Sequence, residues 1–186
     1  MRKLFITLLV LLLGTPLLSL SATTQEVEEL FLEGKTICLI AAHKCTFKMV
    51  DLDLPLAYTQ YNDITVMSGI YNKLTKDELR GIIYHEVAHA VSNHSQQGQE
   101  FFNHFVSEYK RPPYPAEVQN FRYKLENEAD AKAVLLLFAA RKPILLDTAL
   151  VKVTKPYNNT GASSTHPSIE SRVKHIQNMR WKLEGN

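Results

Sequence analysis

The sequence predicts a single α+β domain that is mostly helical and carries a small antiparallel sheet. Two long segments, 76–94 and 116–140, combine good helix formers with apolar positions. Three short segments are rich in β-branched and aromatic residues and predict strands: 36–40, 46–53 and 63–67. A chain of 186 residues is long enough to bury one core of its own.

The remaining elements follow in chain order. Residues 24–34 predict an amphipathic helix. The helix 76–94 has a start signal, because Thr75 and Glu78 form a capping box before an apolar run. Prolines make 103–115 irregular, since they cannot occupy a helix interior. The helix 116–140 contains the apolar run 133–138, which is too short to span a membrane and is expected in the core. A short helix at 144–152, a loop at 155–167 and a final helix through Trp181 complete the chain.

The first 22 residues have the three parts of a signal peptide. Arg2 and Lys3 give a positive start, residues 4–13 are apolar, and the segment ends in small residues at Ala22. We therefore expect residues 1–22 to be removed and residues 23–186 to form one exported domain. The alternative is an uncleaved anchor in the inner membrane through residues 4–20, which is marginal in length for a span.

Charge and cysteine content narrow the class of protein. Without residues 1–22, the chain would carry 19 basic and 19 acidic residues, so no net field attracts nucleic acid or an acidic membrane. The two cysteines, Cys38 and Cys45, lack the spacing of a zinc ribbon or a redox motif. In an exported protein they are expected to form a disulfide, which requires a turn at 41–44. Two buried thiols are the alternative.

The pentapeptide His85-Glu86-Val87-Ala88-His89 is the most informative motif. Residues four apart share one face of a helix, so His85 and His89 can present two imidazoles to one metal ion. Glu86 beside them is a candidate general base. This set of residues predicts a zinc site that hydrolyses amide bonds with an activated water. A polar surface helix is the alternative, but the apolar flanks of the motif argue for burial.

A catalytic zinc site needs a third protein ligand. The position six residues after His89 is Ser95, so the metzincin pattern fails. His94 would point elsewhere on a continuing helix and is read as a helix C-terminal residue. Glu126 is the preferred third ligand, and Asp130, one turn further along the same face, could orient a zinc-bound histidine. Glu128 points away from that face and is expected to be solvated.

These motifs together resemble the HExxH/ExxAD gluzincin metallopeptidase family that includes the CAAX prenyl protease, HtpX and BepA. Segments 57–59, 64–70 and 74–79 resemble the strand and the lead-in to the zinc helix of that family. His166-Pro167 and Arg172 resemble its H-P-x-x-x-x-R element. The resemblance covers about residues 30–180 and implies a zincin-like domain with its sheet beside the zinc helix. Leu56 stands where the family often has asparagine.

The resemblance implies that residues 23–186 form the catalytic domain of a periplasmic zinc endopeptidase. It would hold one zinc ion per chain and act on unfolded or misassembled envelope proteins. His166 or Arg172 would stabilise the oxyanion, or His166 would occupy the open zinc position and keep the enzyme latent. Protein or peptide substrates are expected as partners, with substrate added to the edge of strand 63–67. Peripheral membrane or outer-membrane assembly partners stay open. The rival functions are a zinc-stabilised chaperone or adaptor that does not cleave, and a purely structural zinc site.

Overall fold

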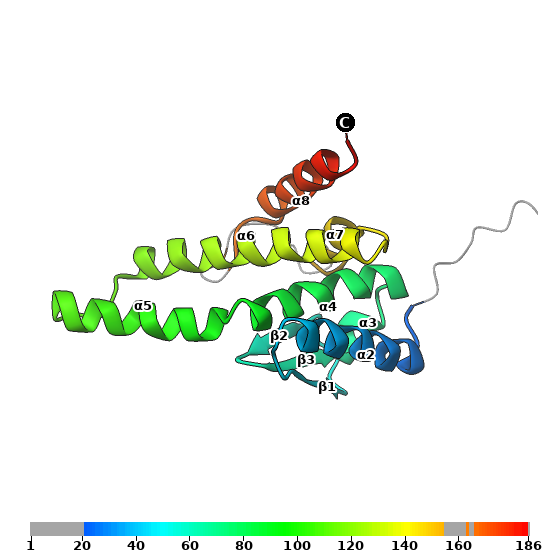
Figure 1. The fold of residues 1–186 in the computed structure, drawn as a ribbon, viewed down its shortest axis with the longest axis horizontal. Coiled ribbons are helices and arrows are strands. Elements are labelled where there is room, and N and C mark those ends of the chain that lie inside the picture. The colour runs from blue at the N-terminus through cyan, green and yellow to red at the C-terminus, as the bar shows by residue number, and fades with distance from the viewer. Residues whose placement is uncertain (1–20, 155–162, 164–165, 186) are drawn as a thin grey trace, which may run out of the picture.

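Helix α4 (Lys76–Val91) runs through the middle of the domain, between α6 (Pro115–Ala139) and a layer formed by the sheet and α2 (Thr24–Ile40) (Figure 1). The computed structural model describes residues 21–154, 163 and 166–185. Most of the predicted signal peptide and of the loop 155–167 lies outside these residues. Twelve of the sixteen residues of α4 are buried, so the motif that it carries lies in the core of the protein.

The start of α4 confirms the capping box. The Thr75 hydroxyl accepts a hydrogen bond from the Glu78 backbone N–H, and the Glu78 carboxylate accepts one from the Thr75 backbone N–H. Both bonds satisfy amide groups that have no partner within the helix. Lys152 of α7 (Leu146–Thr154) forms a 2.6 Å ion pair with the same carboxylate. The cap therefore also ties α4 to α7.

The sheet is mixed, and the prediction of an antiparallel sheet was wrong. Strand β3 (Asp63–Met67) lies between β1 (Thr46–Val50) and β2 (Ala57–Gln60); it pairs antiparallel with β2 and parallel with β1. The reason is the connection 51–56, which crosses the end of β3 before the chain returns as a hairpin. A Cβ at Gly69 would lie 2.4 Å from the Leu54 backbone nitrogen. The crossover thus requires glycine at this position, in the short helix α3 (Ser68–Tyr71).

Helix α2 continues to Ile40, so the strand predicted at 36–40 was wrong. The β-branched residues there are accommodated in a helix that packs against α4 and β1. The chain then turns, with Ala42 in the left-handed region at φ 60°. This turn brings Cys38 and Cys45 together in a disulfide. The turn that a disulfide would require at 41–44 is therefore present.

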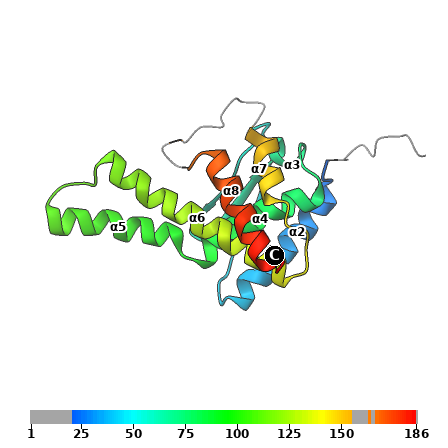
Figure 2. The ribbon, with the colours of Figure 1, turned by 90° about the horizontal axis from the view of Figure 1, so that it is seen from above.

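Two helices, α5 (His94–Tyr109) and the first half of α6, form a hairpin that projects from the rest of the domain (Figures 1 and 2). Phe101 and Phe121 stack across it with ring centroids 4.2 Å apart. The sequence predicted one helix over 76–94 and an irregular stretch over 103–115. Instead, α4 ends at Val91, a second helix begins at His94, and only residues 110–114 are irregular.

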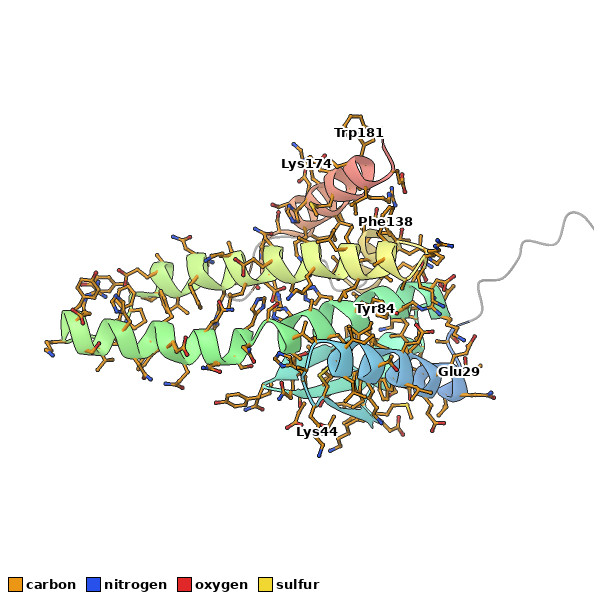
Figure 3. The ribbon with its side chains drawn as sticks, viewed as in Figure 1. Glu29, Lys44, Tyr84, Phe138, Lys174 and Trp181 are labelled. Atoms are coloured by element: carbon orange, nitrogen blue, oxygen red, sulfur yellow. A yellow bond between two sulfur atoms is a disulfide. The ribbon has the colours of Figure 1, made fainter. Side chains whose placement is uncertain are left out.

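Helices α7 and α8 (Ile169–Leu183) cover the other side of α4 and α6 (Figure 2). Figure 3 shows side chains filling the space between the layers, with Tyr84 between α4 and α2 and Trp181 on the outer side of α8. The mostly helical α+β class is confirmed. Within the residues described here, no helix has the length and apolar character needed to cross a bilayer.

Candidate metal centre

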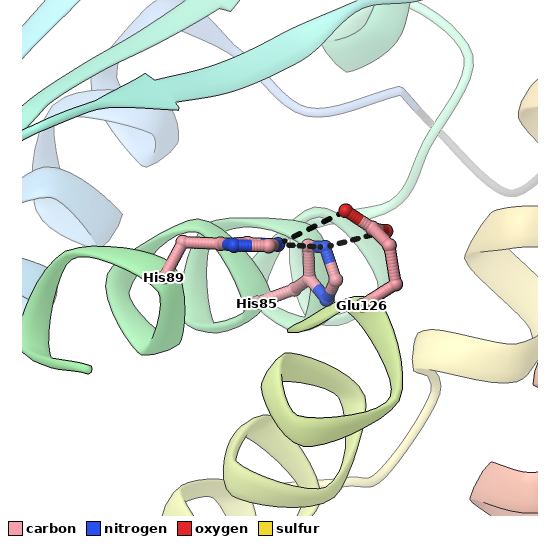
Figure 4. Close-up of side chains that lie close together, drawn as sticks. All are labelled: His85, His89 and Glu126. Atoms are coloured by element: carbon pink, nitrogen blue, oxygen red, sulfur yellow. Dashed lines mark hydrogen bonds and ion pairs between the residues drawn. The ribbon is translucent and has the colours of Figure 1, made fainter. Parts of the chain in front are cut away.

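His85 and His89 lie one turn apart on the face of α4 that meets α6 (Figure 4). Their Nε2 atoms are 3.1 Å apart. His85 is buried and the side chain of His89 is 16% exposed. The four-residue spacing thus does what the sequence predicted, because it directs two ring nitrogens to one point.

Glu126 comes to the same point from α6. Its Oε1 lies 3.3 Å from His89 Nε2, and its Oε2 lies 3.6 Å from His85 Nε2. Ala129 and Ala133 are fully buried on the adjoining part of α6 and let the two helices approach closely. The small residues therefore have a structural role that the sequence indicated: they bring a carboxylate within reach of the histidines.

This group fits a zinc ion. Zinc–nitrogen and zinc–oxygen bonds of about 2.0–2.1 Å in a tetrahedron place neighbouring ligand atoms roughly 3.3 Å apart, and the three separations here are 3.1, 3.3 and 3.6 Å. Two imidazoles and one carboxylate also match the ligand set of catalytic zinc sites that keep a fourth position open. A purely structural site would need a fourth protein ligand, and the metal-binding group among the described residues has three: His85, His89 and Glu126.

Asp130 orients the first histidine. Its Oδ1 lies 2.9 Å from Nδ1 of His85 and its exposure is 0%. Arg172 of α8 donates two hydrogen bonds to the same carboxylate, from Nε at 2.8 Å and from a terminal nitrogen at 2.7 Å. Its other terminal nitrogen lies 3.4 Å from Glu126. Arg172 therefore fixes both carboxylates, and its assignment as an oxyanion donor stays a prediction.

His94 occupies a place that the sequence did not predict. It was expected to be a C-terminal residue of the zinc helix, pointing elsewhere. Instead it begins α5, is 4% exposed, and places its Nδ1 2.9 Å from Nδ1 of His89. The expectation failed because Asn93 adopts the left-handed conformation at φ 55° and redirects the chain. The Ser92-Asn93 pair is the only local sign of this break, since asparagine tolerates that conformation.

Glu86 is held in place by the edge strand. The Thr59 hydroxyl on β2 lies 2.8 Å from Oε2 of Glu86 and 2.9 Å from the backbone oxygen of the same residue. The exposure of Glu86 is 7%. The sequence places Thr59 only within the segment 57–59 that resembles the family, because nothing in its local sequence connects it with Glu86. The contact shows that β2, rather than the predicted strand 63–67, is the edge strand beside the motif.

His166 reaches the centre from the segment before α8. Its Nδ1 lies 2.8 Å from Oε2 of Glu126, and its side chain is 51% exposed. It is therefore close to the candidate ligands but still in contact with solvent. Two further histidines lie outside the metal-binding group of the described residues: His104 is exposed on α5, and His175 lies on α8.

The charges of the centre stabilise ionised carboxylates. Burial by itself would raise the pKa of Glu126, but hydrogen bonds with His166 and His89 hold that pKa well below its usual range. Burial also opposes the charge of Asp130, yet Arg172 lowers its pKa to about 2. Burial, followed by the charge of His89, lowers the pKa of His94 to about 4. At neutral pH, two carboxylates and a neutral His94 thus surround the two zinc-facing rings.

A pocket of about 280 Å³ opens beside His85 and Glu86. Arg172 and His166 give the pocket part of its polar lining. Its apolar lining comes from α3, α4, α7 and the start of α8: Ile70, Ile82, Leu150, Val153 and Ile169. Pro55, Leu56 and Ala57 line the side next to the edge strand. The candidate general base therefore faces a cavity that accepts an apolar side chain.

Residues 21–109 match the family model described as peptidase family M48. The chain is a zinc metalloendopeptidase, and this part of it is similar to peptidase family M48. The match contains His85, Glu86 and His89 and ends at the last residue of α5. Glu126, Asp130 and Arg172 lie beyond it, so their place in the centre rests on the distances above. A comparison with curated proteins found no match.

Proposed function

We propose that this metalloendopeptidase cleaves unfolded or misassembled proteins of the bacterial cell envelope after export to the periplasm. The observation that carries the proposal is the position of Glu86, held by the edge strand β2 on one side and open to an apolar pocket on the other. An extended substrate that adds to a sheet edge is bound by its main chain, which is common to all sequences. This mode of binding suits many different unfolded chains.

The chemistry uses the residues of the centre in distinct roles. Zinc, when bound by His85, His89 and Glu126, supplies a Lewis acid that brings the pKa of a water ligand near neutrality. The Glu86 carboxylate takes a proton from the attacking water and later passes a proton to the leaving amine nitrogen. Thr59 holds that carboxylate in position. His166 lines the same pocket. It either donates a hydrogen bond to the oxyanion or covers the open zinc position.

The pocket indicates which peptide bonds are favoured. Leu150 and Val153 of α7 and Ile82 of α4 present apolar surface next to Glu86. Burying a large apolar side chain there gains about 1.5–3 kcal/mol. Folded proteins keep such side chains in their cores, whereas unfolded proteins expose them. The pocket therefore supports cleavage beside large apolar residues and a preference for unfolded substrates.

The disulfide supports the compartment. Disulfides persist in oxidising compartments such as the periplasm and are rare in the cytosol, and Cys38 and Cys45 are joined. The predicted signal peptide agrees with this location, although its first 20 residues lie outside the described part of the structure. Mass spectrometry of the protein from the expressing cell should find an N-terminus near Thr23. An intact Met1 in the membrane fraction would favour the anchor.

The decisive test of activity compares wild type with Glu86→Gln on casein, which is largely unfolded, and on a tightly folded protein. We expect wild type to cleave casein and to spare the folded protein. Glu86→Gln should retain zinc and lose hydrolysis by about 100-fold or more, the usual scale for a lost acid–base group. Glu100→Gln, an exposed change on α5, is the matched control and should behave as wild type.

The same experiment separates the rival function. A zinc-stabilised chaperone or adaptor would suppress aggregation of unfolded casein without producing fragments, and Glu86→Gln would make no difference to it. Absence of fragments with the zinc-loaded wild type would refute the proposal. Fragments that persist at the wild-type rate with Glu86→Gln would refute the role of Glu86.

A further inference from the structure

The chain turn between α4 and α5 places the ring of His94 directly against the ring of His89. In an unbroken helix, a residue five positions on would lie about 140° around the axis from His89. The left-handed conformation of Asn93 breaks the helix and returns His94 to the same side. The two rings meet edge to face, with centroids 4.8 Å apart and Nδ1 atoms 2.9 Å apart.

The hydrogen bond between these nitrogens has one direction once zinc is bound. Nε2 of His89 faces His85 and Glu126, so this nitrogen ligates zinc. The neutral ring of His89 then carries its proton on Nδ1. Nδ1 of His94 must then accept. The proton of His94 is therefore on Nε2, which lies 3.6 Å from Oε2 of Glu128. If His94 were cationic, its Nδ1–H would face the Nδ1–H of His89, and the hydrogen bond between the two rings would be lost.

His94 thus has the same relation to His89 that Asp130 has to His85: each contacts the ring nitrogen that faces away from the metal. Asp130 contacts Nδ1 of His85 at 2.9 Å, and His94 contacts Nδ1 of His89 at the same distance. Zinc-bound histidines commonly have a hydrogen bond at the second nitrogen, which sets the ring orientation and the tautomer. One ligand here uses a carboxylate for this purpose, whereas the other uses a neutral imidazole.

The turn that carries His94 is anchored from two sides. Lys132 of α6 donates a 2.8 Å hydrogen bond to the Ser92 hydroxyl, and the Tyr61 backbone N–H donates one of 2.8 Å to the Ser95 hydroxyl. His94 is also the one buried residue of α5, whose sixteen residues are all described. A buried polar ring and an anchored turn, on a helix with no other buried residue, indicate a defined position for this side chain.

We propose that His94 is a positioning residue for the zinc centre, which accepts a hydrogen bond from His89 and so fixes the ring that ligates the metal. It does not touch zinc, because it contacts the nitrogen of His89 that faces away from the cluster. The proposal rests on the zinc site and not on the choice of substrate. It also assigns Asn93 the task of turning the chain so that His94 reaches its place.

The test replaces His94 by side chains that differ in one property. His94→Leu fills the site but cannot accept a hydrogen bond, whereas His94→Asn presents an amide oxygen close to the position of Nδ1. His94→Ala is a second variant without an acceptor and fits in any case. His104→Leu, at an exposed position of the same helix, is the matched control for losing a histidine. The readouts are zinc affinity by chelator competition and the visible spectrum after cobalt(II) substitution.

We expect His94→Leu and His94→Ala to bind zinc about 10–100-fold more weakly, the scale for loss of an outer partner. Their cobalt spectra should shift, because the ring of His89 is no longer held. His94→Asn should recover affinity to within a few-fold of wild type, and His104→Leu should match wild type. Wild-type affinity and spectrum in His94→Leu and His94→Ala would overturn the proposal. So would an equal loss in His94→Asn, because packing rather than the acceptor would then be responsible.

Discussion

Replacing Glu126 by glutamine should remove most of the zinc affinity, whereas the same change at Glu128 should not. The two residues are two positions apart on α6 and face different surroundings. Glu126 is 7% exposed and within 3.6 Å of both zinc-facing ring nitrogens. The side chain of Glu128 is 46% exposed and lies 3.6 Å from the neutral ring of His94 and 3.7 Å from the ammonium group of Lys124.

The magnitude follows from the number of ligands. Structural zinc sites with four ligands bind with about 10–16 kcal/mol of apparent free energy, which is roughly 3 kcal/mol for each ligand. An amide in place of the Glu126 carboxylate keeps the shape but loses the charge, so about 100-fold of zinc affinity should be lost. Glu128→Gln removes a half-exposed charge at a distance, and exposed pairs contribute about 0–1 kcal/mol. Its affinity should remain within a few-fold of wild type.

The assay is a competition with a chelator of known affinity at neutral pH, followed by metal analysis of the dialysed protein. A thermal melt of the metal-free proteins checks that both variants fold. Arg172 keeps its two bonds to Asp130 in Glu126→Gln, so its charge stays paired. If Glu128→Gln loses more zinc than Glu126→Gln, the assignment of the third ligand is wrong.

Three further outcomes are expected. Asp130→Asn should weaken zinc binding by roughly 10–100-fold in the same competition, because His85 loses its carboxylate partner; unchanged affinity would refute this. His166→Ala should raise peptidase activity if the ring caps the centre beside Glu126; a fall of about 100-fold would assign the ring to the oxyanion instead, and no change would remove both roles. Burial, followed by the charge of Glu33, raises the pKa of Tyr84 to about 12. The folded chain therefore keeps a proton that the unfolded chain loses above about pH 10, and stability falls between about pH 10 and 12 by on the order of 2 kcal/mol. Urea titrations at several pH values should show that the free energy of unfolding of Tyr84→Phe falls less between pH 10 and 12 than that of wild type. An equal fall in both proteins would contradict the reasoning.

The parts of the centre that the sequence predicted are those set by helix periodicity. The four-residue spacings of His85 with His89 and of Glu126 with Asp130 each place two side chains on one face. The capping box at Thr75 identified the start of α4 because its two hydrogen bonds are local. Where the chemistry depends on spacing within one helix, sequence was sufficient.

The parts that the sequence did not predict depend on contacts between distant segments or on one backbone angle. The parallel pairing of β1 with β3 follows from the crossover at 51–56, which is held by hydrogen bonds from the backbone of Met67 and Gly69, later in the chain. The helix α5 is stabilised by aromatic stacking with α6, while its own composition is polar. The position of His94 depends on the left-handed conformation of Asn93, which asparagine permits but does not require.

The distribution of the centre along the chain determines when the enzyme becomes active. His85 and Glu126 are far apart in the sequence, and Arg172, which holds Asp130, belongs to the last helix. Zinc can be bound by the full set of ligands only after α6 has docked on α4, and the orienting contacts are complete only after α8 has packed on α6. A chain that is still being synthesised or is still unfolded lacks a working centre. Two unfolded copies of the chain therefore cannot cleave one another, because each brings its zinc ligands to one point only on folding.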